Sequence, residues 1–178
     1  DMMKAYDRFE WPYLRAVMLK MGFSPRFTDT VMRCVSSISF SVMFNARSLD
    51  DFKPSRGLRQ GDPSSPYLFL LAAEGLSCLL KAGAGVRGIT VAPNAQSVNH
   101  LLFADDSLLF FEANDDSATR IDELLRIYCN ASGQRVNMGK SSIFFSKGVP
   151  NSARDSIKNI LTVHNESLTE EYLGLPSD

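Results

Sequence analysis

Apolar residues recur at the spacing of an α-helix in five stretches of the chain. They cover residues 13–21, 27–35, 67–80, 121–128 and 157–161. Pro12 lies at the start of the first stretch, where a helix loses nothing by lacking an N–H. The third stretch is apolar almost throughout and is followed by glycines from position 83, so we expect it to back a sheet.

Other stretches have the pattern of β-strands. Residues 38–44 alternate apolar and polar positions, Asn45-Ala46 follows as a predicted turn, and residues 49–53 are the predicted return strand. Further strands are predicted at residues 89–91, 143–145 and 168–175, and a hairpin at residues 98–110. Helix pairs interleaved with antiparallel hairpins predict an α+β fold, with one antiparallel sheet and helices packed on one face, formed by residues 1–178 as one domain.

Two adjacent carboxylates, Asp105 and Asp106, interrupt the apolar run from Leu101 to Phe111. The flanking residues predict two short strands with Ala104-Asp105-Asp106 at the tip of the turn. Neighbouring carboxylates repel each other unless a cation or a proton compensates. Asp is also a common turn residue because its side chain binds the nearby backbone, so this pattern alone leaves an ordinary turn open.

A polar stretch at residues 54–66 precedes the apolar helix and contains Arg59, Gln60 and Gly61. Glycine lets a backbone approach a ligand closely, and the Arg and Gln side chains donate hydrogen bonds. A helix N-terminus directly after such a loop adds donors and a positive dipole end. A polar connector that caps the helix accounts for the same residues.

Composition limits the classes of function. The formal net charge of −1 is unexpected for a nucleic-acid-binding protein, so either the ligand is not a polyanion or most of the gripping surface lies elsewhere. No apolar run reaches the ~18 residues of a membrane span, and we expect a soluble chain with no membrane partner. Three widely spaced cysteines predict buried, reduced thiols in an intracellular protein. His100 and His164 stand alone, which disfavours Ser-His-Asp or Cys-His chemistry.

Together the motifs resemble reverse transcriptases of the LINE-type, non-LTR retrotransposon class, most like those of plants, over nearly the whole chain. Asp1 with Tyr6 resembles the first catalytic motif of this class, and residues 56–63 followed by 65–69 resemble the second. Residues 103–106 resemble the third, Lys140 lies in a segment similar to the fourth, and Tyr172-Leu173-Gly174 resembles the primer grip.

The resemblance implies a polymerase palm-like fold. Because the chain begins inside the first motif, we interpret it as a palm-region fragment with the fingers incomplete and the thumb absent, and we expect the isolated fragment to be inactive. Missing basic regions would also account for the charge balance. We expect the protein in the nucleus or the cytoplasm.

The resemblance also implies the chemistry of an RNA-directed DNA polymerase, with an RNA template, a DNA primer and deoxynucleoside triphosphates as partners. The primer 3′-oxygen attacks the α-phosphorus, and two Mg²⁺ ions about 4 Å apart stabilise the attacking and leaving oxygens. Mn²⁺ is the alternative metal. By family likeness Asp1 and Asp105 hold both ions, and Asp106 assists on the attacking side.

The remaining roles follow from the same resemblance. Tyr6 lies five residues after Asp1, where the family places an aromatic ring under the incoming sugar to exclude a 2′-hydroxyl. Arg59, Gln60 and Gly61 are implied to bind the nucleotide, and Lys140 to protonate the pyrophosphate leaving group. Alternatively, Tyr6 is one more core aromatic and Lys140 a solvated charge.

Two features depart from the family pattern. Ser64 stands where these enzymes commonly carry Leu, and Ala46 stands where Gly usually follows Asn. Both hint at a decaying genomic copy, so an inert remnant that only binds nucleic acid or protein is the alternative function. A palm-fold nucleotidyl cyclase is a third hypothesis, against which the Arg-Gln-Gly loop argues. The sequence leaves the oligomeric state open.

Overall fold

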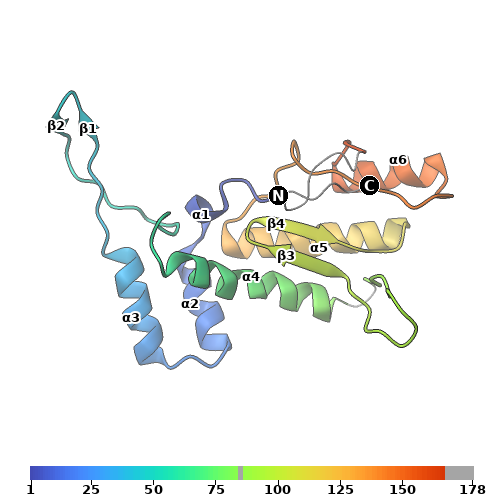
Figure 1. The fold of residues 1–178 in the computed structure, drawn as a ribbon, viewed down its shortest axis with the longest axis horizontal. Helices are drawn as coiled ribbons and strands as arrows, with labels where there is room; N and C mark the ends of the chain where they lie inside the picture. The colour runs from blue at the N-terminus through green and yellow to red at the C-terminus, as the bar shows by residue number, and fades with distance from the viewer. Residues whose placement is uncertain (84–85, 167–178) are drawn as a thin grey trace. The chain divides into compact units, whose positions relative to one another are not determined.

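The computed structural model describes residues 1–83 and 86–166, which form two compact units (Figure 1). Unit 1 contains residues 1–3, 76–129 and the chain from residue 135 onward. Unit 2 contains residues 4–75 and 130–134. The helices α4 (Ser65–Ala82) and α5 (Asp115–Ser132) contribute residues to both units.

Unit 2 begins with three helices, α1 (Ala5–Arg8), α2 (Trp11–Lys20) and α3 (Pro25–Ser36). Proline lies in the first turn of both α2 and α3, where its missing N–H costs no hydrogen bond. Ser24 caps α3, because its hydroxyl oxygen accepts a hydrogen bond of 3.3 Å from the Phe27 amide. Local sequence signals thus set the starts of both helices.

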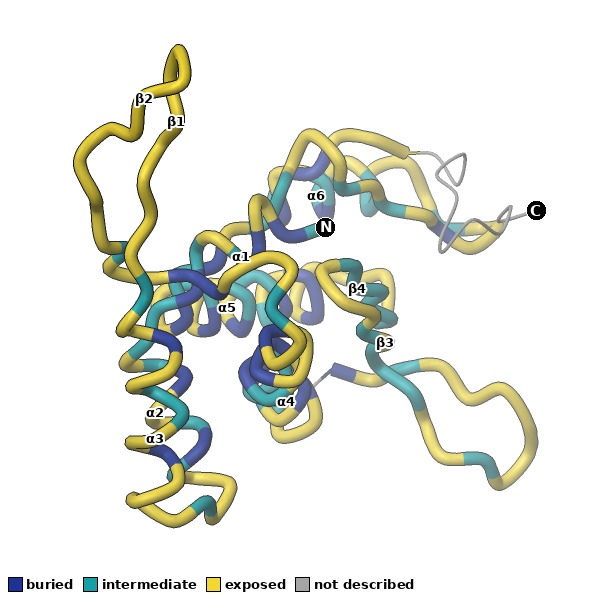
Figure 2. Tube along the Cα trace, turned by 60° about the vertical axis from the view of Figure 1, so that its left-hand side comes forward, coloured by how far each residue is buried: buried dark blue, intermediate teal, exposed yellow. Residues whose placement is uncertain are grey.

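A hairpin of strands β1 (Met43–Phe44) and β2 (Arg47–Ser48) follows α3. Its turn residues, Asn45 and Ala46, adopt positive φ angles of 47° and 60°. Figure 2 shows that this hairpin is exposed along its whole length. The predicted turn at Asn45-Ala46 is therefore confirmed, although Ala lacks the freedom of Gly in this region.

Unit 1 contains a second antiparallel hairpin, formed by β3 (His100–Phe103) and β4 (Asp106–Leu109). Side chains next to and in β3 attach it to α4: Asn99 Nδ2 donates to the Leu80 carbonyl at 2.8 Å, and His100 Nε2 lies 3.0 Å from Ser77 Oγ. Helix α6 (Asn151–Leu161) belongs to the same unit.

Each unit has its own buried apolar residues. Those of unit 1 are Met2, Leu76, Leu80, Val86, Ala118, Ile121, Leu124, Tyr128, Phe145, Ile157, Leu161 and Val163. Those of unit 2 are Ala5, Phe9, Leu14, Met18, Val35, Leu58, Leu68, Phe69 and Ala72. The apolar periodicity of α2, α4, α5 and α6 supplies most of both sets.

The predicted α+β class and the antiparallel pairing are confirmed. The single predicted sheet is not found among the described residues, where the pairing consists of two separate two-stranded sheets and isolated bridges. In the first hairpin Leu49 bonds to Val42, but Phe40 bridges Phe52, so one extra residue interrupts the ladder. The strand predicted at residues 168–175 lies outside the described residues.

Two further strands were predicted at residues 89–91 and 143–145. In the structure these segments form isolated bridges or single hydrogen bonds, not ladders. Ile89 bridges Val98, and the Ile143 amide donates to the Asn165 carbonyl beside a bridge between Ser142 and Asn165. Short apolar runs predict extended backbone, whereas a ladder needs a partner that matches over several residues.

The cysteines differ from the prediction of buried thiols. Cys34 and Cys78 are exposed and Cys129 is half-buried, because their helices turn these positions away from the apolar faces. Burial raises the pKa of the Cys129 thiol, an effect that a hydrogen bond with the Val136 backbone partly offsets. Across the described residues, none of the helices is both long enough and apolar enough to span a bilayer.

Candidate active site

The acidic pair lies at the tip of the β3–β4 hairpin, as the sequence predicts. Because Phe103 pairs with Asp106, the loop contains only Ala104 and Asp105. Ala104 adopts a φ of 50°, which a two-residue hairpin turn requires. Asp105 is exposed at the tip, and Asp106 is the half-buried first residue of β4.

The first residues of the chain lie beside this tip. The Met2 amide donates a hydrogen bond of 3.2 Å to the Asp105 carbonyl, and Met2 also forms an antiparallel bridge with Val136. The Met3 amide donates to the Arg135 carbonyl at 2.8 Å. Residues separated by more than a hundred positions thus become backbone neighbours within unit 1.

Asp1 has two side-chain partners on the segment after α5. Asn137 Nδ2 donates to Asp1 Oδ1 at 3.3 Å, and Lys140 Nζ lies 3.9 Å from Asp1 Oδ2. The lysine side chain is 72% exposed and that of Asp1 23%. A cation so exposed and so distant contributes little stability. Lys140 nevertheless lies beside Asp1, and its role as a general acid stays a prediction.

The three carboxylates do not form a ready-made metal site. Among the residues that the structure describes, no three His, Cys, Asp or Glu side chains are grouped closely enough to hold an ion. The structure therefore joins the backbones that carry Asp1 and Asp105 but does not group all three carboxylates. Their role as shared metal ligands stays a prediction.

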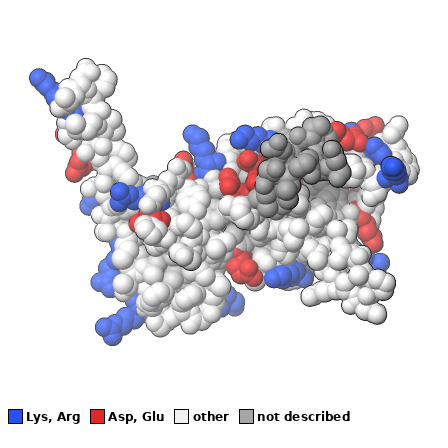
Figure 3. Space-filling view, in the orientation of Figure 1, with Lys and Arg blue, Asp and Glu red and all other residues white. Residues whose placement is uncertain are grey.

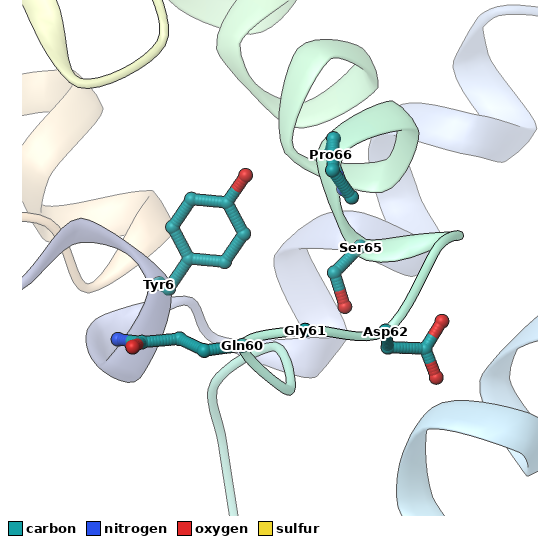
Figure 4. A pocket seen from close by; sticks show the side chains of 6 residues that line it. All are labelled: Tyr6, Gln60, Gly61, Asp62, Ser65 and Pro66. Atoms are coloured by element: carbon teal, nitrogen blue, oxygen red, sulfur yellow. The ribbon is translucent and has the colours of Figure 1, made fainter.

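Unit 2 contains an open pocket of about 540 Å³ (Figure 4). Its lining comes from α1, from the Arg-Gln-Gly loop and from the start of α4: Tyr6, Gln60, Gly61, Asp62, Ser65 and Pro66. In Figure 4 the Tyr6 ring stands beside the loop on the side facing α4. The volume falls in the range of small-ligand sites, about 300–1,000 Å³.

Aromatic packing fixes the Tyr6 ring. It stacks on the buried Phe69 ring with a centroid distance of 5.0 Å and an interplanar angle of 9°. Phe9 contacts Phe69 edge-on at 5.4 Å. Offset stacking and edge-to-face contacts are the favoured aromatic geometries, so Tyr6 presents a preorganised wall to the pocket.

The Arg-Gln-Gly loop is attached to the start of the chain by hydrogen bonds. The Gly57 amide donates to the Phe9 carbonyl at 2.7 Å, and Trp11 Nε1 donates to the Gly57 carbonyl at 2.7 Å. Gln60 Nε2 donates to Asp7 Oδ1 at 3.4 Å. Tyr6, Gln60 and Gly61 thus line one pocket, and their role in nucleotide binding stays a prediction.

Arg59 is exposed and does not line the pocket. Its charge acts instead on Asp62, whose pKa is lowered chiefly by the hydroxyl and amide of Ser64, which donate to Asp62 Oδ1 at 2.6 and 2.8 Å. Ser64, the residue that departs from the family pattern, therefore orders the loop before α4 by hydrogen bonding.

Sequence reasoning missed two polar neighbours of the predicted residues. Asn137 contacts Asp1, and Asp7 contacts Gln60. Asp7 directly follows Tyr6, and Asn137 lies three positions before Lys140 in a polar turn, so both were close to residues already singled out. The predicted primer grip, Tyr172-Leu173-Gly174, lies outside the described residues.

Comparison with known proteins identifies relatives from mobile elements. The chain is 31% identical over 142 residues to the transposon TX1 uncharacterized 149 kDa protein of Xenopus laevis, covering 80% of this chain and 11% of the relative. It is 29% identical over 150 residues to the Pol polyprotein from retrotransposable element R2DM of Drosophila melanogaster, covering 84% of this chain and 14% of the relative.

A plant protein is also among the relatives, in agreement with the predicted similarity to plant sequences. An uncharacterized mitochondrial protein of Arabidopsis thaliana is 56% identical over 57 residues, covering 30% of this chain and 47% of the relative. The chain thus spans between 11% and 47% of the length of these three curated relatives. The resemblance to non-LTR retrotransposon proteins is confirmed.

The sequence profile of one family, described as reverse transcriptase (RNA-dependent DNA polymerase), matches residues 1–176. The match includes the acidic hairpin, the segment around Asp1 and the Arg-Gln-Gly loop. The chain therefore belongs to the reverse transcriptase (RNA-dependent DNA polymerase) family.

Proposed function

We propose that this chain is the catalytic palm of an RNA-directed DNA polymerase, which transfers a nucleotide to a primer 3′-hydroxyl on an RNA template. The observation that carries the proposal is the hydrogen bond from the Met2 amide to the Asp105 carbonyl. It supports the assignment because it brings Asp1 beside the hairpin tip that carries Asp105 and Asp106.

The donor set fits a hard divalent cation. Carboxylate oxygens are the ligands that Mg²⁺ prefers, and Mg²⁺ is usually bound by one or two carboxylates together with substrate phosphates. Asp1 and Asp105 would hold two Mg²⁺ or Mn²⁺ ions, with Asp106 assisting. When bound, these ions stabilise the attacking and leaving oxygens.

The pocket of unit 2 supports a nucleotide-binding role. Tyr6 would lie under the incoming sugar, where its stacked ring excludes a 2′-hydroxyl, and Gln60 and Gly61 would contact the nucleotide through amide and backbone groups. Arg59 would attract the triphosphate from the edge of the loop. The primer grip at residues 172–174 remains part of this proposal.

Lys140 would supply a proton to the pyrophosphate leaving group. Its ammonium is exposed and pairs only distantly with Asp1, so it is available to an anionic substrate. General-acid assistance of this kind contributes about 10²–10⁴-fold to a rate.

The alternative is a catalytically inert remnant, and the departures from the family pattern at Ser64 and Ala46 are the observations that favour it. Such a remnant would at most bind nucleic acid or protein. The two proposals differ in whether nucleotide is incorporated.

Primer extension on poly(rA)/oligo(dT) with Mg²⁺ separates the two proposals. The protein is expressed from its full open reading frame, as wild type and as Asp105→Asn, with circular dichroism to verify folding. We expect incorporation of dTMP by the wild type and a loss of at least about 10³-fold in the variant. Wild-type protein that folds but incorporates nothing would support the inert remnant.

A further inference from the structure

Asn137 holds Asp1 through two separate hydrogen bonds. Its side-chain Nδ2 donates to Asp1 Oδ1 at 3.3 Å, and its backbone amide donates to the Asp1 carbonyl at 3.0 Å. One bond comes from the side chain of Asn137 and the other from its backbone, and both end on Asp1. They therefore define both where the Asp1 backbone lies and how its carboxylate is turned.

Asn137 is itself fixed by its surroundings. Its carbonyl accepts hydrogen bonds from the Lys140 amide at 3.1 Å and from Ser141 Oγ at 2.8 Å. On its other side, Val136 bridges Met2. The amide that reaches Asp1 thus belongs to a turn with little freedom to move.

The arrangement treats the two oxygens of Asp1 differently. Oδ1 accepts from the Asn137 side-chain amide, whereas the one partner of Oδ2 among residues 1–83 and 86–166 is the exposed Lys140 ammonium at 3.9 Å. A distant, solvated lysine cannot orient a carboxylate, because such pairs are worth about 0–1 kcal/mol. The asparagine amide is therefore the group that leaves Oδ2 open to a cation.

We infer that Asn137 is a positioning residue for Asp1, turning Oδ2 toward a divalent cation by holding Oδ1. This inference rests on the proposed metal-binding role of Asp1. Hydrogen-bonded partners of metal ligands commonly contribute 10–100-fold to metal affinity, because they orient the ligand before the metal arrives. Asn137 is such a hydrogen-bonded partner of Asp1, although the two residues are 136 positions apart in the sequence.

The chain offers a matched control in Asn165. Its Nδ2 donates to the Gly139 carbonyl at 3.3 Å and to the Ser141 carbonyl at 3.4 Å, so it supports the same turn. Among the described residues its side chain donates to these two carbonyls and not to Asp1, and it is exposed. Asn165→Ala therefore removes an equivalent amide from the turn while it leaves the Asp1 carboxylate in place.

The test measures binding of Mn²⁺ alone to residues 1–178 by electron paramagnetic resonance of the free ion. We expect Asn137→Ala to weaken binding by roughly 10-fold or more, and Asn165→Ala by less than about twofold. Asn137→Leu, which keeps most of the volume but lacks the donor, should match Asn137→Ala. Melting temperatures without metal show whether the variants fold equally well.

Two further variants separate failure of this inference from failure of the proposed function. Asp1→Asn and Asp105→Asn should both weaken Mn²⁺ binding. If they do and both Asn137 variants bind like Asn165→Ala, the positioning role is overturned while the metal site stands. If neither aspartate affects binding, or the wild type binds no Mn²⁺, the metal site itself is overturned, and the positioning role with it.

Discussion

Gly57 and Gly61 share a backbone conformation but have different surroundings. Both adopt positive φ angles, 88° and 84°. A Cβ added at Gly57 would lie 3.0 Å from the Asp7 carbonyl oxygen and 3.1 Å from that of Tyr6, whereas one added at Gly61 would meet nothing within 4 Å. The obstacle at Gly57 is backbone, which cannot move aside as a flexible side chain can.

We therefore expect Gly57→Ala to lower the free energy of unfolding more than Gly61→Ala does. Both variants share the cost of left-handed backbone, about 1–2 kcal/mol, and Gly57→Ala adds roughly 1–3 kcal/mol of overpacking. Urea denaturation followed by circular dichroism measures the difference. Equal losses in the two variants would contradict the close packing of the loop against α1.

The residue scale also shows what sequence could anticipate at the site. Of the four residues predicted to bind the nucleotide, Tyr6, Gln60 and Gly61 line one pocket, whereas Arg59 does not. The bond between Asn137 and Asp1 joins residues 136 positions apart. Neither residue carries a local signal for this contact, because a single amide and a single carboxylate have many potential partners until the backbone is placed.

At the scale of elements, helices were easier to predict than strands. The apolar run at residues 67–80 lies within α4, Ser65–Ala82, and the run at 121–128 lies within α5, Asp115–Ser132. A helix satisfies its hydrogen bonds within one segment, so local spacing and end signals suffice. Strand pairing depends on a distant partner, and among the described residues the strands form two separate two-stranded sheets in place of the predicted single sheet.

The turn of the β1–β2 hairpin is strained at Ala46, and this strain can be tested. Ala46 has a φ of 60°, where an L-residue pays about 1–2 kcal/mol, whereas the extra entropy of Gly costs roughly 0.5–1 kcal/mol. Ala46→Gly should therefore stabilise the hairpin by up to about 1 kcal/mol. The measurement is hydrogen exchange at the Leu49 amide, which donates to the Val42 carbonyl at 2.9 Å.

Asn45→Gly is the matched control for this turn. Asn45 has a φ of 47°, but Asn tolerates the left-handed region, so we expect a change in protection smaller than that of Ala46→Gly. Slower exchange in Ala46→Gly alone would identify the alanine as the source of strain. Faster exchange in that variant would show that the Ala side chain stabilises the turn.

At the scale of the whole molecule, charge distribution limits how the chain can hold nucleic acid. Lys and Arg number 19 and Asp and Glu number 20. Figure 3 shows the two signs interspersed over the visible face, without a continuous basic stripe. Tight binding of a polyanion requires several phosphates to be neutralised together, and affinity then falls steeply with salt.

Residues 1–178 should consequently bind a labelled poly(rA)/oligo(dT) duplex weakly and with a shallow dependence on salt. We expect a Kd of about 10⁻⁴–10⁻⁶ M near physiological salt, and a slope of log K against log[NaCl] no steeper than about −3, which corresponds to three or four phosphates. Fluorescence anisotropy between 50 and 200 mM NaCl measures both quantities. We choose this range because the affinity of a strongly basic surface for nucleic acid falls steeply across it. A nanomolar Kd with a slope near −10 would mean that a basic surface forms on the chain despite its balanced charge. A shallow slope would agree with the balanced charge of residues 1–178, in which few phosphates are neutralised together.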